Sequence, residues 1–341
     1  ALNASLLQKA REFRMFDRLV AIDVPSGYCA DSGKSLNIKN GTPQNFKCDL
    51  TVSFHCAKVG HHLADCTNGT GRLSIADIGL PPRAAWYHLG KLVKGKKRSR
   101  RDYSDIVRLK GDWSLLPGFS DEKSILDKGW HDNLYHKYNH GHALILSGGT
   151  GKTGAARLSA RGALRIGAGL VTLGVPPAAQ QEVASQITAL MLTCVEDGTR
   201  LTETLKDERL NALCLGPALG KGSRERALIL AALEAKRPTV LDADALTPLF
   251  FDEADALFGK LHDQCVLTPH GGEFARMFPD IAEKLNAPAT KGPAYSKVDA
   301  TREAAARAGC VVLFKGPDTV IAVPDGRCSI NSAHYERAAP W

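Results

Sequence analysis

Strand-like and helix-like segments alternate over residues 139–341, and this alternation constrains the fold more than any other feature of the sequence. Short runs rich in Val, Ile and Leu are typical of strands, and the stretches between them have the Ala, Leu and Arg content of helices. Such an alternation predicts an α/β domain in which helices cover a parallel sheet. We expect strands at 143–147, 170–175, 191–195, 212–215, 239–241, 265–267, 311–314 and 319–323, and helices at 155–166, 223–235 and 296–308.

The sequence before residue 139 divides into two further zones. Residues 1–80 contain short β-rich runs, whereas residues 81–138 have weak periodicity, and we interpret them as a connector. The connector includes the basic run Lys94–Arg101, which supplies much of the net charge of +8. A basic run can bind nucleic acid, but this one has no interleaved aromatic residues and no recognition motif. We therefore interpret it as a solvated linker and expect no nucleic-acid partner.

Composition argues against several other classes. A chain of 341 residues that is 44% hydrophobic can bury a large core without disulfide bonds. It has no apolar run long enough to span a membrane and no signal-peptide core at its start, so we expect a cytoplasmic protein without a membrane partner. The nine cysteines include no CxxC pair, which favours reduced thiols over a zinc site.

A glycine-rich loop follows the first expected strand of the α/β region, with glycines at 148, 149, 151 and 154. Glycines between a strand and a helix let the backbone approach an anion at the helix N-terminus. A Walker A loop would need glycine where Leu146 stands. The spacing Gly149-x-Gly151-x-x-Gly154 fits a dinucleotide fingerprint, but the second strand lacks the acid that this motif requires. Two interpretations of the glycine loop therefore remain: an anion-binding or nucleotide-binding loop of another kind, and a turn whose glycines serve only packing.

Three more polar loops, 215–220, 268–273 and 315–319, follow later strands. Since parallel strands end at one edge of their sheet, we expect these loops to lie beside the glycine loop. His270 could bind a ligand or exchange a proton, or it could cap the next helix. Glu273 would lie in the first turn of that helix, where the helix dipole stabilises a carboxylate. Lys315 could reach a phosphate or lie on the surface.

Asp242 and Asp244 follow an apolar run and, two residues apart in an extended segment, would point to the same side. They could hold Mg²⁺ or a ribose, or one could cap a helix. Near the N-terminus, a buried-type strand ends in Asp23, which is followed by the turn Pro25-Ser26-Gly27. A carboxylate at a strand end can bind a ribose or move a proton, and turn oxygens suit a hard cation.

Taken together, these motifs resemble the bifunctional NAD(P)H-hydrate repair enzymes. The segments similar to the second half of the epimerase domain are AIDVPSG, DLTVSFHCAKVGH and ADIGLP. The segments similar to the ADP-dependent dehydratase domain are HKYNHGHALILSGGTGKTGAARLSARGALRIGAGLV, LGPALG, LDADAL, LTPHGGEF and LFKGPDTVIAVPDG.

The resemblance implies a ribokinase-like parallel-sheet domain at 139–341, preceded by part of a Rossmann-like α/β domain at 1–80 and the basic connector at 81–138. It implies that the dehydratase uses ADP (or ATP) and Mg²⁺ to restore NADH or NADPH from the S hydrates. It also implies a K⁺-dependent epimerase that interconverts the R and S hydrates. The expected partners are therefore NADH hydrate and NADPH hydrate, and we expect a homo-oligomer.

The resemblance also assigns site residues by position. Ala155, Gly216 and His270 correspond to residues that bind the hydrate. Lys315, Gly316, Pro317, Asp318 and Thr319 correspond to the ADP-binding loop. Asp23 corresponds to a catalytic, hydrate-binding residue of the epimerase, and Ser26 corresponds to a potassium ligand.

The sequence departs from the family pattern at several points. Ala218 stands where the family has the middle glycine of Gly-Pro-Gly-Leu-Gly. The Gly-x-Gly-Asp motif that carries the family's general base would follow Trp341, and the first part of the epimerase would precede Ala1. We therefore expect a fragment that lacks both ends and has little activity. The alternatives are a small-molecule kinase of the same fold and an inactive nucleotide-binding fragment.

Overall fold

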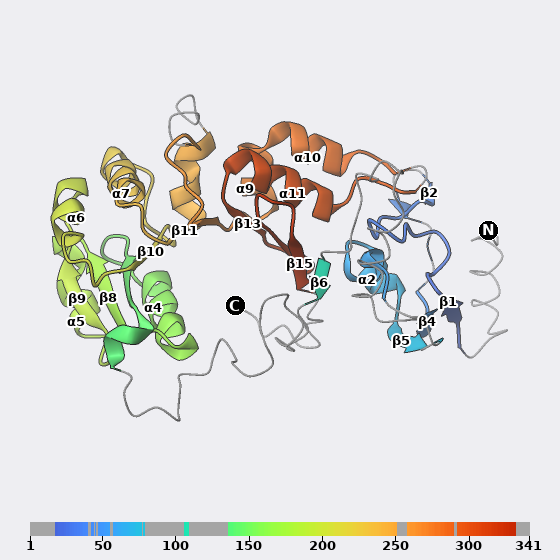
Figure 1. Cartoon of the computed structure of the whole chain (residues 1–341), viewed down its shortest axis with the longest axis horizontal. Helices are drawn as coiled ribbons and strands as arrows, with labels where there is room; N and C mark the ends of the chain where they lie inside the picture. Colours follow the sequence, from blue (N-terminus) through green and yellow to red (C-terminus); the bar gives the residue numbers. More distant parts are fainter. Residues whose placement is uncertain are drawn as a thin grey trace, which may run out of the picture.

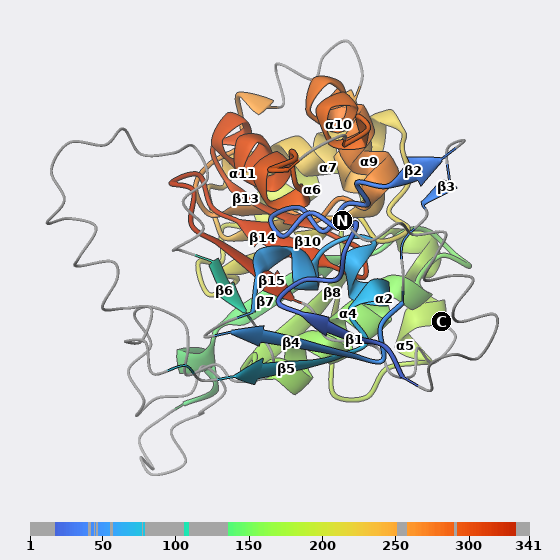
Figure 2. The same ribbon diagram turned by 90° about the vertical axis from the view of Figure 1, so that its right-hand side faces the viewer.

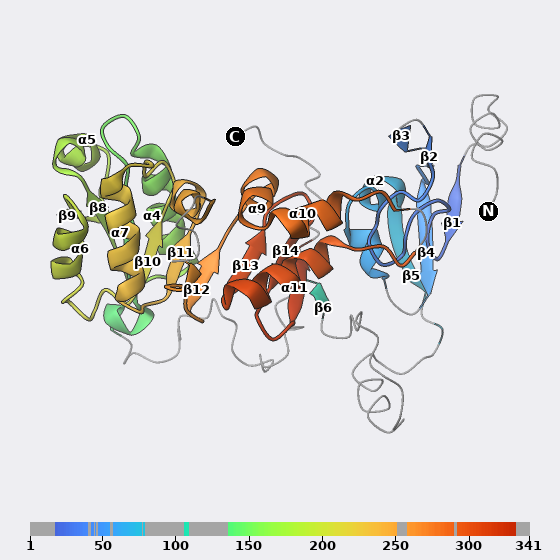
Figure 3. The ribbon, with the colours of Figure 1, turned by 90° about the horizontal axis from the view of Figure 1, so that it is seen from above.

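The computed structural model divides into a large sheet with its helices and a smaller sheet at the opposite end of the molecule (Figures 1 and 3). The basic run 94–101 and residues 332–341 lie outside the part of the chain that the structure describes. The described residues are 18–39, 42–43, 45, 47–54, 57–76, 78, 106–108, 136–250, 258–289 and 292–331.

The large sheet has ten strands in the order β6-β15-β14-β13-β12-β11-β10-β7-β8-β9. Seven neighbouring strands, β13 to β9 in this order, are parallel to one another, while β14 is antiparallel to both β13 and β15. The strands are β6 (Ile106–Arg108), β7 (His142–Leu146), β8 (Leu170–Val175), β9 (Met191–Cys194), β10 (Ala212–Leu215), β11 (Thr239–Leu241), β12 (Cys265–Leu267), β13 (Val311–Phe314), β14 (Thr319–Ala322) and β15 (Cys328–Asn331).

The predicted α/β class with a parallel sheet is confirmed, and each strand expected in this region lies within a residue or two of its predicted place. One expectation was incomplete. The connector contributes β6, which pairs in parallel with β15, so Ile106 lies opposite Cys328. The three residues of β6 are too short a run to show periodicity, and only the pairing partner identifies them as a strand.

Helices cover the sheet and connect its parallel strands. The longer ones are α4 (Gly154–Ile166), α7 (Ser223–Glu234), α10 (Pro279–Asn286) and α11 (Lys297–Ala308). Shorter ones are α5 (Gln180–Ala184), α6 (Gly198–Thr204), α9 (Gly271–Met277) and the 3₁₀ helices η4 (Lys137–His140), η5 (Pro177–Ala179) and η6 (Ala243–Phe250). The three predicted helices are α4, α7 and α11, with ends shifted by one residue at most.

Successive residues of β7 enter two different cores because side chains alternate across a strand. Leu144 and Leu146 belong to the larger core with residues of α7, α9, α10 and α11, whereas Ile145 packs with Ala156 and Ala160 of α4. The sheet is therefore covered on both faces at β7, as a parallel sheet requires.

The smaller sheet consists of three parallel strands in the order β1-β4-β5, namely β1 (Val20–Ile22), β4 (Leu50–Phe54) and β5 (Arg72–Ala76). It is accompanied by η1 (Val59–His62), α2 (Cys66–Gly69) and the short hairpin β2 (Ile38–Lys39) and β3 (Thr42–Pro43). Figure 2 shows this unit in front of the large sheet. Leu63 at the end of η1 is fully buried in the larger core, so the two sheets share one apolar interior.

Among the described residues, none of the helices has the length and apolar content needed to span a bilayer.

Candidate functional site

The glycine loop between β7 and α4 packs against the loop that follows β10. A Cβ atom at Gly148 would lie 1.9 Å from the carbonyl oxygen of Ala218, so this close approach requires glycine. In contrast, a Cβ at Gly149, Gly151 or Gly154 would meet no atom within 4 Å. The loop is thus fixed on one side and leaves room for a ligand on the other.

A carboxylate from α5 already contacts the glycine loop. Glu182 accepts a hydrogen bond from the Gly151 amide at 2.7 Å and another from the Thr153 hydroxyl. These two bonds, the Thr153 bond foremost, hold the pKa of Glu182 below its ordinary value, and the charge of Arg157 adds to the effect. The predicted anion-binding loop therefore already binds the Glu182 carboxylate. A phosphate would have to bind backbone N–H groups of the loop other than that of Gly151.

The loop after β10 has backbone conformations that favour glycine. Gly216 has a φ of +129°, and a Cβ there would lie 1.6 Å from the carbonyl oxygen of Asp242. Ala218, where the family pattern has glycine, also has a left-handed φ of +57°. An L-residue is strained in this region, so the alanine retains a conformation better suited to the glycine it replaces.

The ends of β11, β12 and β13 are joined by polar side chains. The Nζ atom of Lys315 lies 2.6 Å from Oδ1 of Asp242, and the Thr268 hydroxyl donates to the same oxygen at 2.7 Å. The Lys315 amide also donates to the carbonyl oxygen of Pro269 at 2.9 Å. The four loops predicted at one edge of the sheet therefore form one chain of contacts, in which Asp242 joins the 215–220 loop to the 268–273 and 315–319 loops.

Asp242 and Asp244 do not act as a pair, so the expectation that they point to the same side was wrong. Residues from Ala243 onward form η6 rather than an extended segment, because the backbone turns immediately after β11. Asp244 instead accepts a hydrogen bond from the Gly220 amide at 3.1 Å and lies 3.7 Å from Lys221. The two carboxylates do not form a common magnesium site.

His270 is the N-cap of α9, which is the structural alternative considered from the sequence. Its Nδ1 atom accepts from the Gly272 amide at 3.0 Å, while Glu273 accepts from the His270 amide at 2.8 Å. This reciprocal arrangement is a capping box, and it buries Glu273 in the first turn. The His270 side chain is still 55% exposed, so it remains accessible to a ligand.

The loop from Lys315 to Thr319 is held by its own polar groups. The Thr319 hydroxyl donates to the carbonyl oxygen of Gly316 at 2.7 Å and accepts from the Gly316 amide at 3.2 Å. Asp318 is half-buried, pairs with Lys297 at 2.7 Å and also accepts a hydrogen bond from the Ala64 amide at 3.0 Å. Asp318 therefore connects this loop to α11 and to the N-terminal unit.

A second polar cluster lies at the end of β1. Asp23 has a left-handed φ of +66°, and its Oδ1 atom lies 3.0 Å from Nζ of Lys58 and 3.1 Å from the Ser53 hydroxyl. The His61 ring contacts the Asp23 carbonyl oxygen at 2.8 Å. Partial burial raises the pKa of Asp23, but hydrogen bonds from Lys58 and Ser53 outweigh it, so the net pKa is lowered. Strained backbone of this kind is typical of functional sites.

Comparison with known proteins bears on both clusters. The family model described as NAD(P)H-hydrate dehydratase matches residues 143–339, which is more than half of the chain. The chain belongs to the NAD(P)H-hydrate dehydratase family. A second family model, described as YjeF-related protein N-terminus, matches residues 2–60.

Two similar relatives of this dehydratase-family chain are both bifunctional NAD(P)H-hydrate repair enzymes. The one from Moorella thermoacetica is 33% identical, with 92% of this chain and 53% of the relative covered. The one from Synechocystis is 29% identical, with 90% of this chain and 52% of the relative covered. The chain thus spans about half the length of the curated relatives it matches.

A solved structure of the Bacillus subtilis ADP/ATP-dependent NAD(P)H-hydrate dehydratase, co-crystallised with ATP and Mg²⁺, is 28% identical with a TM-score of 0.47. The alignment covers 59% of this chain and 67% of that one.

In this dehydratase-family chain, the predicted site residues fall into two groups. Ala155, Gly216, His270 and the 315–319 loop lie at the carboxyl ends of the large sheet's strands, whereas Asp23 and Ser26 follow β1 of the small sheet. Sequence reasoning did not single out Lys58 or Glu182. The sequence could have pointed to Lys58, since it follows β4, the strand that lies beside β1. The partners of Glu182 could not be found in this way, because only packing brings α5 to the glycine loop.

Proposed function

We propose that this chain takes part in the repair of hydrated NADH and NADPH. The region 139–341 would be the ADP-dependent dehydratase and residues 1–80 part of the epimerase, with 81–138 between them. The carrying observation is that the glycine loop of the large sheet, open at Gly149, Gly151 and Gly154, contacts the loop after β10 at the edge of the sheet where Lys315 also pairs with Asp242. Family membership supports this function over a sugar or vitamin kinase of the same fold.

In this proposal the two phosphate-bearing ligands occupy neighbouring loops. Ala155, Gly216 and His270 would contact the hydrate. The 315–319 loop would hold ADP or ATP, with Mg²⁺ carried on its phosphates. The ammonium group of Lys315 pairs with Asp242, and a nucleotide phosphate in this loop would compete with Asp242 for it.

The reaction needs a good leaving group because hydroxide is a poor one. The ring hydroxyl of the hydrate would attack the terminal phosphorus of ADP and give its proton to solvent, and AMP would depart with the bridging oxygen. The phosphorylated ring carbon would then lose phosphate while the neighbouring carbon loses a proton, which restores the double bond of NAD(P)H. The loops would supply positioning and charge neutralisation, which account for most of the catalysis in phosphoryl transfer.

The second cluster supports the epimerase part of the proposal. The Asp23 carboxylate, ionised because of Lys58 and Ser53, would contact the hydrate and move a proton. Ser26 is exposed, and the turn in which it lies offers hydroxyl and carbonyl oxygens, a set of ligand atoms that suits K⁺. The cytoplasmic location and the homo-oligomer remain predictions, and light scattering tests the latter.

Calorimetry on the whole chain tests the main proposal. We expect ADP and NADP⁺, used as a stable stand-in for the hydrate, to bind together without competing. Turnover of NADPH hydrate with ADP or ATP, followed by the return of reduced nicotinamide absorbance, also checks the expectation of little activity. A chain that binds a sugar or a hydroxymethylpyrimidine and ignores NADP⁺ would be a small-molecule kinase instead.

A further inference from the structure

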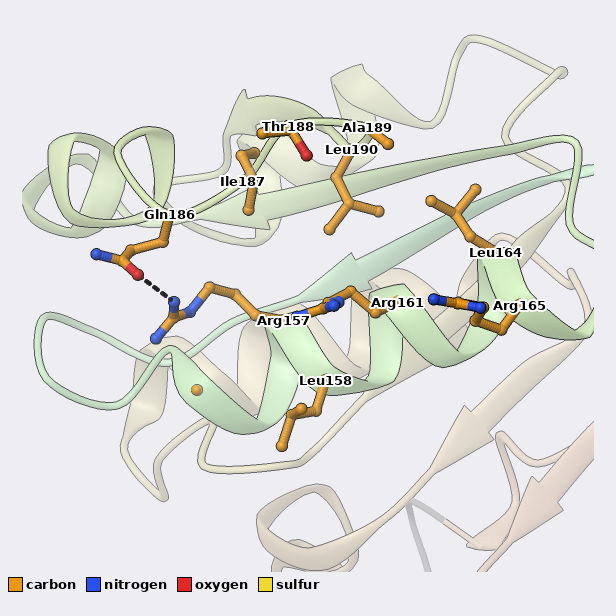
Figure 4. A pocket seen from close by; sticks show the side chains of 11 residues that line it. Arg157, Leu158, Arg161, Leu164, Arg165, Gln186, Ile187, Thr188, Ala189 and Leu190 are labelled. Atoms are coloured by element: carbon orange, nitrogen blue, oxygen red, sulfur yellow. Dashed lines mark hydrogen bonds between the residues drawn. The ribbon is translucent and has the colours of Figure 1, made fainter.

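A groove with three arginines runs along α4. It has a volume of about 540 Å³ and lies between α4 and the segment 186–190 that precedes β9. Figure 4 shows Arg157, Arg161 and Arg165 in a row on the helix, facing this segment, while Leu164 and Leu190 form an apolar wall. The groove therefore combines positive charge with an apolar surface.

The three guanidinium groups are not neutralised. Among the described residues, no carboxylate forms an ion pair with any of them, although Glu182 exerts a longer-range effect on Arg157. Arg157 donates to Gln186 at 3.3 Å, and its Nε atom is buried without a partner. Like charges four residues apart on a helix repel one another, so this row destabilises α4 unless an anion binds.

The groove begins where the glycine loop ends. Gly154 lines the groove and is also the first residue of α4, next to Ala155, which we propose contacts the hydrate. From Arg157 to Arg165 the helix rises about 12 Å, since each residue adds about 1.5 Å. A row of this length exceeds the size of one phosphate and matches an elongated ligand that carries several.

We propose that this groove binds the adenosine end of the dinucleotide, and that Arg161 and Arg165 bind the 2′-phosphate that distinguishes NADPH hydrate from NADH hydrate. The inference rests on the proposed function. Arginine suits this role because its planar fork donates two hydrogen bonds to a phosphate, and an arginine commonly accommodates the 2′-phosphate of NADP. The apolar wall formed by Leu164 and Leu190 would pack against the adenine. The chain therefore prefers the phosphorylated dinucleotide.

Titration of NADP⁺ and NAD⁺ into the whole chain tests this inference. In the double variant Arg161→Ala/Arg165→Ala we expect NADP⁺ to bind about tenfold more weakly, as for the loss of a charge-assisted bond, and NAD⁺ to change less than about twofold. Arg200→Ala is the matched control, because Arg200 is an exposed arginine on α6 that pairs with Glu203. Circular dichroism verifies that the variants are folded.

Three outcomes would overturn the inference: no binding of NADP⁺ to the unaltered chain, unchanged NADP⁺ binding in the double variant, or an equal loss for both dinucleotides. The failure of the proposed function has a different signature. If the double variant loses its NADP⁺ preference but the chain never converts a hydrate, the groove binds NADP⁺ as proposed and only the proposed function fails. If hydrates are converted and the preference is unchanged, only the groove assignment fails.

Discussion

Two non-glycine residues with left-handed backbone mark the two polar clusters. Asp23 has a φ of +66° at the end of β1, and Ala218 has a φ of +57° in the loop after β10. Each conformation costs on the order of 1 kcal/mol for an L-residue, so the surrounding contacts must hold it in place. At Asp23 those contacts come from Lys58, Ser53 and His61, which also orient its carboxylate and carbonyl groups.

Alanine substitution at two adjacent glycines should have very different effects on stability. In Gly148→Ala the new methyl group would overlap the Ala218 carbonyl, and we expect a loss of about 2 kcal/mol or more in the free energy of unfolding. Gly149→Ala places its methyl group in open space and should change this free energy little. Denaturant unfolding measures both, and equal effects would contradict the close approach of the two loops.

The pKa of Asp23 should rise when Lys58 is replaced. Because the folded pKa lies below the unfolded one, the interaction stabilises the fold above the unfolded pKa, and this stabilisation disappears as pH falls through the folded pKa. Lys58→Met removes a hydrogen bond and a positive charge, so the burial that raises the pKa is then opposed only by the hydrogen bonds from Ser53 and the Phe54 backbone. Carbon NMR titration of the carboxyl group gives the value directly. Lys206→Met, an exposed lysine on the other sheet's unit, should leave it unchanged.

At the scale of single elements, the local sequence predicted the positions of the longer helices well. The α4, α7 and α11 helices have the expected positions because their apolar periodicity and their end signals agree, as with Ser296, the N-cap of α11. The prediction of an extended segment after β11 was wrong, because two aspartates in an apolar run are compatible with an extended chain and with a helical turn. Only the tight approach of Gly216 to Asp242 reveals where the chain must turn.

The attachment of α5 to the glycine loop should be measurable at one amide. In Glu182→Ala the Gly151 N–H loses its acceptor and Thr153 loses its carboxylate partner. We expect faster hydrogen exchange at Gly151, since the amide is then released to solvent. Glu203→Ala, on α6, is the control. Unchanged exchange at Gly151 would show that the contact with α5 does not hold the loop.

At the scale of the whole molecule, the N-terminal unit is packed onto the C-terminal half of the large sheet. The Lys34 ammonium group donates to the carbonyl oxygen of Leu285, the Ala64 amide donates to Asp318, and Leu63 is buried in the shared core. The Ala64 bond ends on the loop that we propose holds ADP. Asp318 therefore joins the N-terminal unit to that loop, and it also pairs with Lys297 of α11.

Truncation of Leu63 should weaken the whole molecule. Leu63→Ala leaves a cavity in a core shared by both units, and we expect the free energy of unfolding to fall by about 2–5 kcal/mol. Leu158→Ala is a control of the same chemistry, because Leu158 is 70% exposed and its loss should have little effect. Denaturant unfolding followed by circular dichroism measures both. Equal effects would mean that Leu63 does not join the two units.

The sequence by itself determined the order of strands and helices, the parallel sheet, and the edge where the polar loops gather. These features follow from local periodicity and from the rule that parallel strands end on one side. Only the tertiary structure decided the partner of each polar side chain. Lys315 pairs with Asp242, 73 positions away in the sequence, and Asp318 accepts a hydrogen bond from Ala64, 254 positions away. Such contacts could not be predicted from the sequence, because they depend on how the elements pack and leave no periodic pattern in it.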